Sequence, residues 1–152
     1  APPPSEEGGL PMPLAVAAAE WCRHAAPGDG GACRSLLRQR PSFAETLGKQ
    51  VRGVLVRPPN LHLCPPALLH TLAAAAVSAA LLQLKLRLED CFCGPPGSEV
   101  PQEAAEALWR AFCDSEENLP HLEIVSFLLT MPHTGVRDYS LRALLSCLGL
   151  GQ

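Results

Sequence analysis

Aromatic side chains are scarce in this sequence, at 5% of residues, although 47% of the residues are hydrophobic. A β-sandwich core draws mainly on β-branched and aromatic side chains, so a core supplied by Ala and Leu favours helices packed on helices. An excess of basic residues is also lacking, because the formal net charge is −3, which gives no overall attraction to nucleic acid or to an anionic membrane. The 152 residues suit one domain of the all-α class with its own hydrophobic core.

The recurring motifs of catalysis are absent as well. No Ser or Cys occupies a strand–turn–helix elbow, and no Gly-rich loop is placed to hold a phosphate. His24, His70 and His121 fall within predicted helices, where surface or core positions are the ordinary interpretation, and His133 falls in a turn, where it suits helix capping. We therefore predict that the chain is not an enzyme and that it binds no cofactor and no small-molecule substrate.

Four residues of zinc-ligand type lie in two pairs, His62 with Cys64 and Cys91 with Cys93. The pairs flank a predicted helix of about 26 residues, which separates them by roughly 39 Å at 1.5 Å per residue. A zinc site needs every donor within about 2.3 Å of one ion. The spacing therefore predicts no shared metal site.

The stretch from Pro65 to Cys93 has no Pro or Gly after its first turn. Apolar and polar residues alternate between Leu81 and Glu89, as in a half-buried strand, but the residue types there are good helix formers. Its nearly all-apolar section, 72–82, in which only Ser78 is polar, is too short to cross a bilayer, which needs about 20 apolar residues, so we expect no membrane. A helix would carry two apolar stripes and lie covered on two sides at the centre of the fold. The stripes are Val77, Leu81, Leu84 and Leu88, and Leu82 with Leu86.

Sixteen prolines and twelve glycines punctuate the chain and divide its remainder into shorter predicted helices. Residues 1–13 are predicted to be a disordered lead-in, residues 14–149 a single helical domain, and residues 150–152 a tail. Six shorter helices and the central helix make about seven helices in all. The segment from Asn60 to Cys64 is predicted to be a linker. The shorter helices are expected at 14–26, 31–40, 42–57, 98–113, 118–131 and 136–148.

Several single residues in these helices have predicted roles. Ser42 and Glu45 have the spacing of a capping box, and Asn118 is placed to cap the helix that follows it. Trp21 and Trp109 lie on apolar faces, which predicts core positions for both, or an interface anchor for one of them.

Seven cysteines are an odd number, and most of them lie within apolar helical patterns. Cys22, Cys33, Cys113 and Cys147 are predicted to be small buried hydrophobic residues. This use of cysteine, together with the lack of a signal peptide and of an N-glycosylation sequon, predicts an intracellular protein of the cytoplasm or nucleus. The sequence has no initiator Met, so we expect a fragment of a longer chain or a processed form.

Charge is unevenly spread along the chain. Basic residues predominate from Arg34 to Arg57, and acidic residues predominate from Glu89 to Glu123, opposed there only by Arg110. One interpretation is two faces that are solvated or that attract each other within the fold; the other is a basic surface that binds a partner. No aromatic residues interleave the basic ones, so nucleic acid is not the expected partner. The candidate partner-binding residues are Arg34, Arg38, Arg40, Arg52 and Arg57.

The final predicted helix pair, residues 119–149, carries a recognisable pattern. An apolar helix is followed by a turn with Pro132, then by Val136-Arg137 and by Ala143-Leu144 down the second helix. This pattern resembles a repeat of the HEAT or armadillo type. The sequence departs from it at Ser140, where Ala is usual, and at Met131, where such repeats often carry an Asp. The resemblance implies an irregular array of helical hairpins around the long central helix, acting as a scaffold that binds other proteins.

Two functional hypotheses follow. The first is a non-enzymatic protein–protein interaction or scaffold module, part of a larger subunit of an intracellular multi-protein complex, with other protein subunits as its partners. The alternative is a secreted helical-bundle ligand of cytokine type with disulfides, since an N-terminus reading APPP also suits a mature end after signal cleavage. The odd number of cysteines and the short helices favour the first hypothesis.

Overall fold

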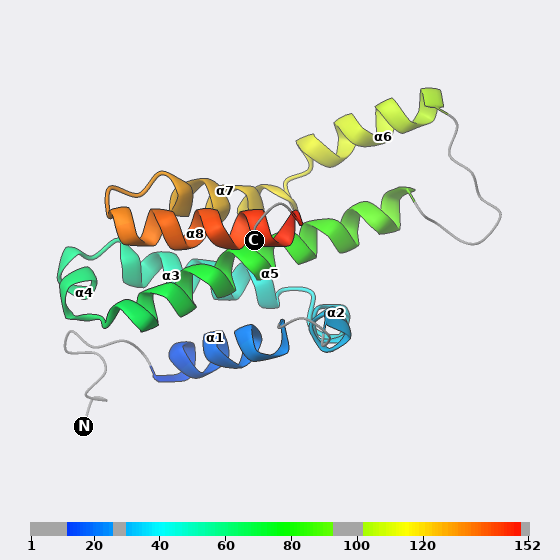
Figure 1. The fold of residues 1–152 in the computed structure, drawn as a ribbon. Helices are drawn as coiled ribbons and strands as arrows, with labels where there is room; N and C mark the ends of the chain where they lie inside the picture. Colours follow the sequence, from blue (N-terminus) through cyan, green and yellow to red (C-terminus); the bar gives the residue numbers. More distant parts are fainter. Residues whose placement is uncertain (1–11, 26–29, 93–101, 150–152) are drawn as a thin grey trace.

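The computed structural model describes residues 12–25, 30–92 and 102–149, and every regular element in these ranges is an α-helix. The predicted all-α class is confirmed (Figure 1). The predicted lead-in, apart from Met12 and Pro13, which begin the first helix, and the predicted tail lie outside the described residues. The helices are α1 (Met12–His24), α2 (Gly30–Gln39), α3 (Phe43–Leu55), α4 (Pro58–Leu63), α5 (Pro66–Phe92), α6 (Gln102–Asp114), α7 (Leu119–Leu129) and α8 (Thr134–Cys147).

The described residues form one helix more than the sequence analysis predicted. This helix is α4, which begins with Pro58 and Pro59 and includes Asn60, so the linker expected from Asn60 to Cys64 is wrong. The error came from treating the two prolines only as a stop signal. In the first turn of a helix, a proline loses no hydrogen bond, because the amide groups there have no partner within the helix.

The central position of α5 is confirmed. This helix packs against α1, α3, α7 and α8, and more lightly against α2 and α6 (Figure 1). Five of its alanines are fully buried, and their small side chains let neighbouring helices approach closely from several directions. These residues are Ala73, Ala75, Ala76, Ala79 and Ala80.

The covering of α5 is less complete than its two predicted stripes suggested. Val77 and Leu86 are buried, but the remaining leucines of the stripes are only half-buried. In Figure 1 the C-terminal part of α5 projects beyond the ends of α7 and α8, with α6 above it. The sequence pattern predicted where the apolar faces lie, whereas the lengths of the neighbouring helices determine how far those faces are covered.

By length and composition, α5 is the one helix in the described ranges that could cross a membrane, over the 26 residues from Pro66 to Cys91. This stretch is longer than the segment 72–82 considered above. Half of its most apolar window is buried against other helices of the chain, and the core helix of a soluble protein passes the same test. The feature is therefore weak evidence about a membrane.

The two tryptophans have different environments. Trp21 is 2% exposed, stacks on Phe43 with ring centroids 5.7 Å apart, and donates a hydrogen bond from Nε1 to Ser78 Oγ at 3.1 Å. Trp109 is 52% exposed and stacks on Phe112 of its own helix with centroids 5.9 Å apart. The predicted core position is confirmed for Trp21 and is wrong for Trp109.

The predicted helix caps have mixed outcomes. His133 caps α8, because its Nδ1 accepts a hydrogen bond from the backbone N–H of Val136 at 3.1 Å. Ser42 occupies the N-cap position of α3, but its side chain makes no capping hydrogen bond. Asn118 likewise precedes α7 without capping it, because its Oδ1 accepts a hydrogen bond from Arg87 Nε instead, while its side-chain amide donates to the carbonyl of Phe112 at 2.7 Å.

Gly53 and Gly48 lie on the same helix and give a matched pair of stability predictions. A Cβ added at exposed Gly53 meets nothing within 4 Å, so Gly53→Ala is expected to raise the free energy of unfolding by about 0.5–1 kcal/mol through helix propensity. A Cβ at Gly48 meets Ile124 Cγ1 at 3.2 Å, so Gly48→Ala is expected to gain less. Urea unfolding of both variants measures the difference. Equal gains would show that Ile124 moves aside freely, and no gain from Gly53→Ala would contradict the prediction.

Candidate functional site

Helix α6 has an apolar face that the rest of the described chain covers only in part: Ala105, Leu108 and Phe112 are half-buried and Trp109 is exposed. Its apolar residues recur at the spacing i, i+3, i+4 and i+7, yet none of its side chains from 103 to 114 is buried. Its main packing contact is with the projecting part of α5. We call the face formed by Ala105, Leu108, Trp109 and Phe112 the α6 surface.

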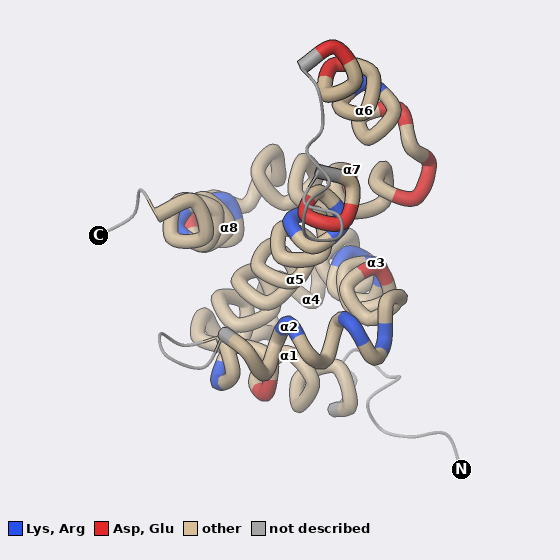
Figure 2. Tube along the Cα trace, turned by 90° about the vertical axis from the view of Figure 1, so that its right-hand side faces the viewer, with Lys and Arg blue, Asp and Glu red and all other residues tan. Residues whose placement is uncertain are grey.

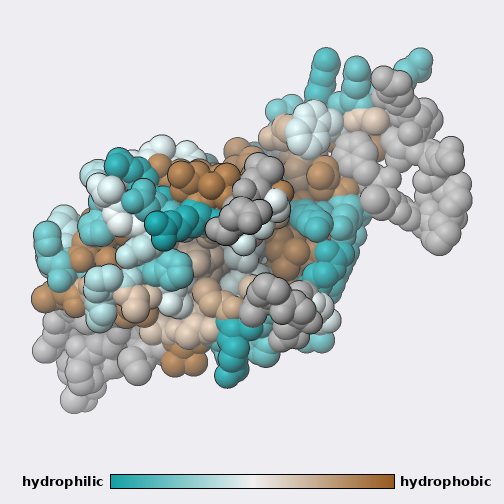
Figure 3. Space-filling model, viewed as in Figure 1, coloured by the Kyte–Doolittle hydropathy of each residue, from teal (hydrophilic) through white to brown (hydrophobic). Residues whose placement is uncertain are grey.

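Figure 3 shows apolar side chains gathered where α6 meets the projecting part of α5. Trp109 is the most exposed large side chain of the α6 surface, and Leu119 and Leu122, at the start of α7, are 42% and 43% exposed. Exposed tryptophans supported by a second aromatic ring are typical anchors of protein–protein interfaces. The alternative role predicted for one tryptophan, an interface anchor, stays a prediction, and of the two only Trp109 is exposed enough for it.

A polar network fixes the turn between α6 and α7 to the central helix. The Arg87 side chain, on α5, donates hydrogen bonds to the side chains of Asn118 and Glu117. Asn118 is 1% exposed, and its amide also donates to the carbonyl of Phe112 at the end of α6. These hydrogen bonds connect the C-terminal end of α6, at Phe112, to α5, at Arg87. They therefore fix the position of the α6 surface relative to the central helix.

Acidic residues surround the α6 surface. Glu103 lies in the first turn of α6, where a carboxylate is favoured by the helix dipole. Glu106 lies one turn before Trp109, Asp114 is the last residue of α6, and Glu116 lies in the turn to α7. Figure 2 shows acidic residues along α6 and the turn that follows it. In the described part of the chain, none of these four carboxylates forms an ion pair. The acidic run from Glu89 to Glu123 is visible in the sequence and contains Trp109, so the sequence held an indication of this site.

The predicted basic residues are divided between different surroundings. Arg34 Nη2 lies 2.6 Å from Glu89 Oε1, and Arg38 Nη1 lies 2.7 Å from Asp90 Oδ2, so both arginines of α2 pair with the end of α5. The hydrogen bond from Arg34 lowers the pKa of Glu89, and the hydrogen bond from Arg38 lowers the pKa of Asp90. For these two residues, the structure shows the attraction within the fold that the first interpretation proposed.

The other three predicted arginines lie in surroundings that differ from those of Arg34 and Arg38. Arg40 follows α2 and lines a pocket described below, and Arg52 places its guanidinium 4.8 Å from the centroid of the Phe127 ring on α7. Arg57 is exposed at the N-cap position of α4. The structure therefore does not gather the five predicted partner-binding residues into one surface, and their binding role stays a prediction.

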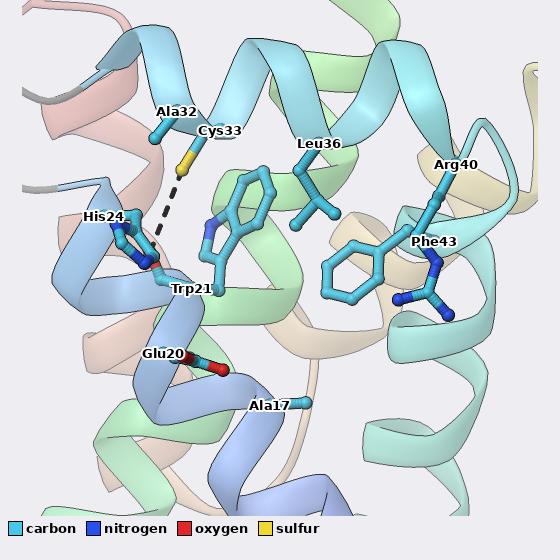
Figure 4. Close-up of a pocket in the computed structure, with 9 residues that line it drawn as sticks. All are labelled: Ala17, Glu20, Trp21, His24, Ala32, Cys33, Leu36, Arg40 and Phe43. Atoms are coloured by element: carbon cyan, nitrogen blue, oxygen red, sulfur yellow. Dashed lines mark hydrogen bonds between the residues drawn. The ribbon is translucent and has the colours of Figure 1, made fainter.

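A pocket of about 350 Å³ lies where α1 and α2 cross (Figure 4). This volume is at the lower end of the range of ligand pockets. Trp21 and Cys33 line it but are each only 2% exposed, and the Cys33 thiol donates to the carbonyl of Trp21 at 3.9 Å. Its polar lining is Glu20, His24 and Arg40. We interpret it as packing space at a helix crossing, since its largest side chains belong to the core.

The cysteines have a different distribution from the one predicted. Cys33 is buried and Cys22 is half-buried, but Cys113 and Cys147 are exposed, so the predicted burial of these last two is wrong. Both lie near the C-terminal ends of α6 and α8, where fewer neighbouring helices cover the surface. No disulfide joins the described cysteines, and burial raises the pKa of the Cys22 thiol, which keeps it neutral and weakly nucleophilic.

The zinc-type residues lie apart, as their spacing predicted. His62 and Cys64 precede α5, Cys91 lies in its last turn, and Cys93 falls outside the described residues. Within the described ranges, no three residues of His, Cys, Asp or Glu type come together to hold a metal ion.

His121 gives a prediction for the dependence of stability on pH. It is 4% exposed on α7, its Nδ1 has no hydrogen-bond partner in the described residues, and burial lowers its pKa, with Glu45 raising the pKa and Arg87 lowering it. The unfolded chain binds the proton with the ordinary pKa of about 6.5, so acidification below that pH favours unfolding. We expect the stability contributed by the neutral imidazole to be fully present above about pH 6.5, the pKa in the unfolded chain, and to be lost as the pH falls from there through the lower pKa of the folded state.

Chemical unfolding at pH 7.5 and 5.5 tests this expectation. The free energy of unfolding should fall more steeply in the wild type than in His121→Gln, whereas His62→Gln, at an exposed position, should keep the wild-type slope. Parallel slopes in all three proteins would show that His121 does not control stability in this window.

Comparisons of the chain with protein-family models, with curated proteins and with solved structures found no match, so the surfaces described above are what bears on its function.

Proposed function

We propose that this chain is a non-enzymatic protein–protein interaction module that serves as a scaffold within a larger subunit of an intracellular multi-protein complex. The observation that carries the proposal is the α6 surface: it lies on an amphipathic helix with no buried side chain among residues 103–114, and Trp109 is 52% exposed. An apolar helix face is normally buried against something, because exposing it to water costs free energy. A partner protein supplies the missing cover.

Two further features support this proposal. The network from Arg87 to Asn118 presents the α6 surface in a fixed position, which lowers the entropy lost on binding. No disulfide joins any two of the described cysteines, which suits a reducing compartment better than a secreted ligand with disulfides.

The helical hairpin of α7 and α8 also supports a scaffold of the HEAT or armadillo type. The two helices pack on each other and on α5. Met131 and Val136 are buried in this hairpin, and Ser140, where such repeats usually carry Ala, is buried with its hydroxyl donating to the carbonyl of Val136 at 2.7 Å. The hydroxyl is thereby satisfied, so Ser at this position is compatible with a buried hairpin.

Site-specific photo-crosslinking in cells tests the proposed function. A benzophenone amino acid at position 109 is expected to form one discrete adduct with another protein, which mass spectrometry then identifies. The same amino acid at position 50, an exposed position on α3, is the matched control and should give no such adduct. Adducts of equal yield at both positions, or none at either, would contradict an interface at the α6 surface.

A further inference from the structure

We infer that the partner of the α6 surface is a positively charged amphipathic helix of another protein, with apolar anchors along one side and Lys or Arg beside them. This inference rests on the proposed function and specifies the chemistry of the partner. It follows from the combination of a partly covered apolar face, with Trp109 exposed, and nearby carboxylates that form no ion pair within the described residues.

The apolar part of the argument sets the shape of the partner. Ala105 to Phe112 span two turns, or about 10 Å of helix at 1.5 Å per residue. A strip of this form is matched by a second helix with apolar residues at i, i+3, i+4 and i+7, the usual mode by which a helix binds a helical surface. Trp109, at the flank of this strip, is the side chain with the most area left to bury.

The charged part of the argument sets the sign of the partner. Glu106 lies three residues from Trp109 and therefore on the same side of α6, and Glu103, Asp114 and Glu116 lie in the same helix and the turn after it. Only Arg110 offers a positive charge within α6. Elsewhere in the described residues, Glu89, Asp90 and Glu117 are paired with arginines, whereas Glu123 on α7 and Asp138 on α8 each stand without an ion pair. Four carboxylates without an ion pair lie together on α6 and in the turn after it, so unpaired negative charge is most concentrated there (Figure 2).

The same charges argue against other occupants. An anionic membrane or a nucleic acid would bring further negative charge to these carboxylates, and repulsion within a Debye length of about 8 Å opposes this. A protein helix with Lys or Arg beside its apolar residues instead gains both burial and attraction.

Binding of labelled helical peptides to the full chain tests the inference. Three 18-residue peptides share one apolar face of leucines and carry Lys, Gln or Glu at the remaining positions, and fluorescence polarisation measures their affinities. We expect the Lys peptide to bind at least tenfold more tightly than the Gln peptide and to lose this advantage as salt is raised. The Glu peptide should bind most weakly.

A pair of variants separates local charge from overall charge. Glu106→Gln/Asp114→Asn/Glu116→Gln removes three carboxylates beside the α6 surface and is expected to weaken binding of the Lys peptide about tenfold. Glu20→Gln/Glu123→Gln/Asp138→Asn removes the same charge from α1, α7 and α8 and should leave binding nearly unchanged. All six side chains are exposed, and circular dichroism checks that both variants keep the wild-type helix content.

Each other outcome overturns the inference in a recognisable way. Equal binding of the Lys and Gln peptides, with a crosslinked partner still found at position 109, would keep the proposed function and remove the charge preference. Binding of anionic vesicles that depends on Trp109 would make the occupant a membrane, and a dimer that is lost in Trp109→Ala would make it a second copy of the chain. No binding of any peptide and no adduct would remove both proposals.

Discussion

Replacing Trp21 by alanine is expected to lower the free energy of unfolding by about 3–5 kcal/mol, the largest loss of stability that we predict for this chain. The side chain is 2% exposed between α1, the start of α3 and α5, where it stacks on Phe43 and donates to Ser78. Its removal leaves a cavity that the surrounding helices fill only in part. For a chain of this length, the melting temperature should fall by roughly 6–20 °C.

Thermal and urea unfolding of three variants divides this effect into its parts. Trp21→Phe keeps most of the apolar volume and loses the indole N–H, so it should cost much less than Trp21→Ala. Ser78→Ala removes the other partner of the hydrogen bond and is expected to cost about 1–2 kcal/mol. If Trp21→Ala cost less than 1 kcal/mol, the crossing of α1 and α5 would not be the close-packed core described here.

Replacing Trp109 by alanine is expected to have the opposite pattern, with little effect on folding and a large effect on partner binding. Since the side chain is 52% exposed, the free energy of unfolding should change by less than about 0.5 kcal/mol. An aromatic anchor at the centre of an interface typically contributes 2 kcal/mol or more, so affinity for the partner should fall by about thirtyfold or more.

The partner identified by crosslinking provides the measurement, by titration calorimetry with wild-type and variant chains. Leu63→Ala is the matched control, because Leu63, at 69%, is the most exposed large apolar residue in the part of the chain that the structure describes, and it lies on α4, away from α6. Unchanged affinity in Trp109→Ala would exclude this residue as the anchor. A drop in melting temperature comparable to that of Trp21→Ala would show instead that Trp109 belongs to the core.

Most helices could be predicted from sequence because their ends depend on local chemistry. The predicted helix at 42–57 appears as α3, and the predicted helix at 136–148 appears as α8, with His133 capping it as expected. The strand-like alternation from Leu81 to Glu89 is helical, because good helix formers outweigh the period of the pattern. The exception is α4, where two prolines begin a helix.

The candidate site was harder to predict, since periodicity identifies an apolar face but not what covers it. Trp21 and Trp109 both lie on apolar faces, and sequence alone gave no way to distinguish them. The acidic run was visible in the sequence, whereas its division into paired and unpaired carboxylates was not. Glu89 has an ion-pair partner, whereas Glu103 has none in the described residues. The partner of Glu89 is Arg34 on α2, which is 55 residues away in the sequence and reaches Glu89 only in the folded chain.

The sequence by itself determined the helical class, the central role of the Ala-rich stretch around Val77 and the places where most helices end. These properties depend on residues within a few turns of each other, through propensity, period and the effects of Pro and Gly. Only the tertiary structure decided which faces are buried, which arginines are already paired and that the apolar side of α6 is covered only in part. Such properties depend on contacts between residues far apart in the chain, and a helix of given pattern is exposed or buried according to the neighbours that reach it.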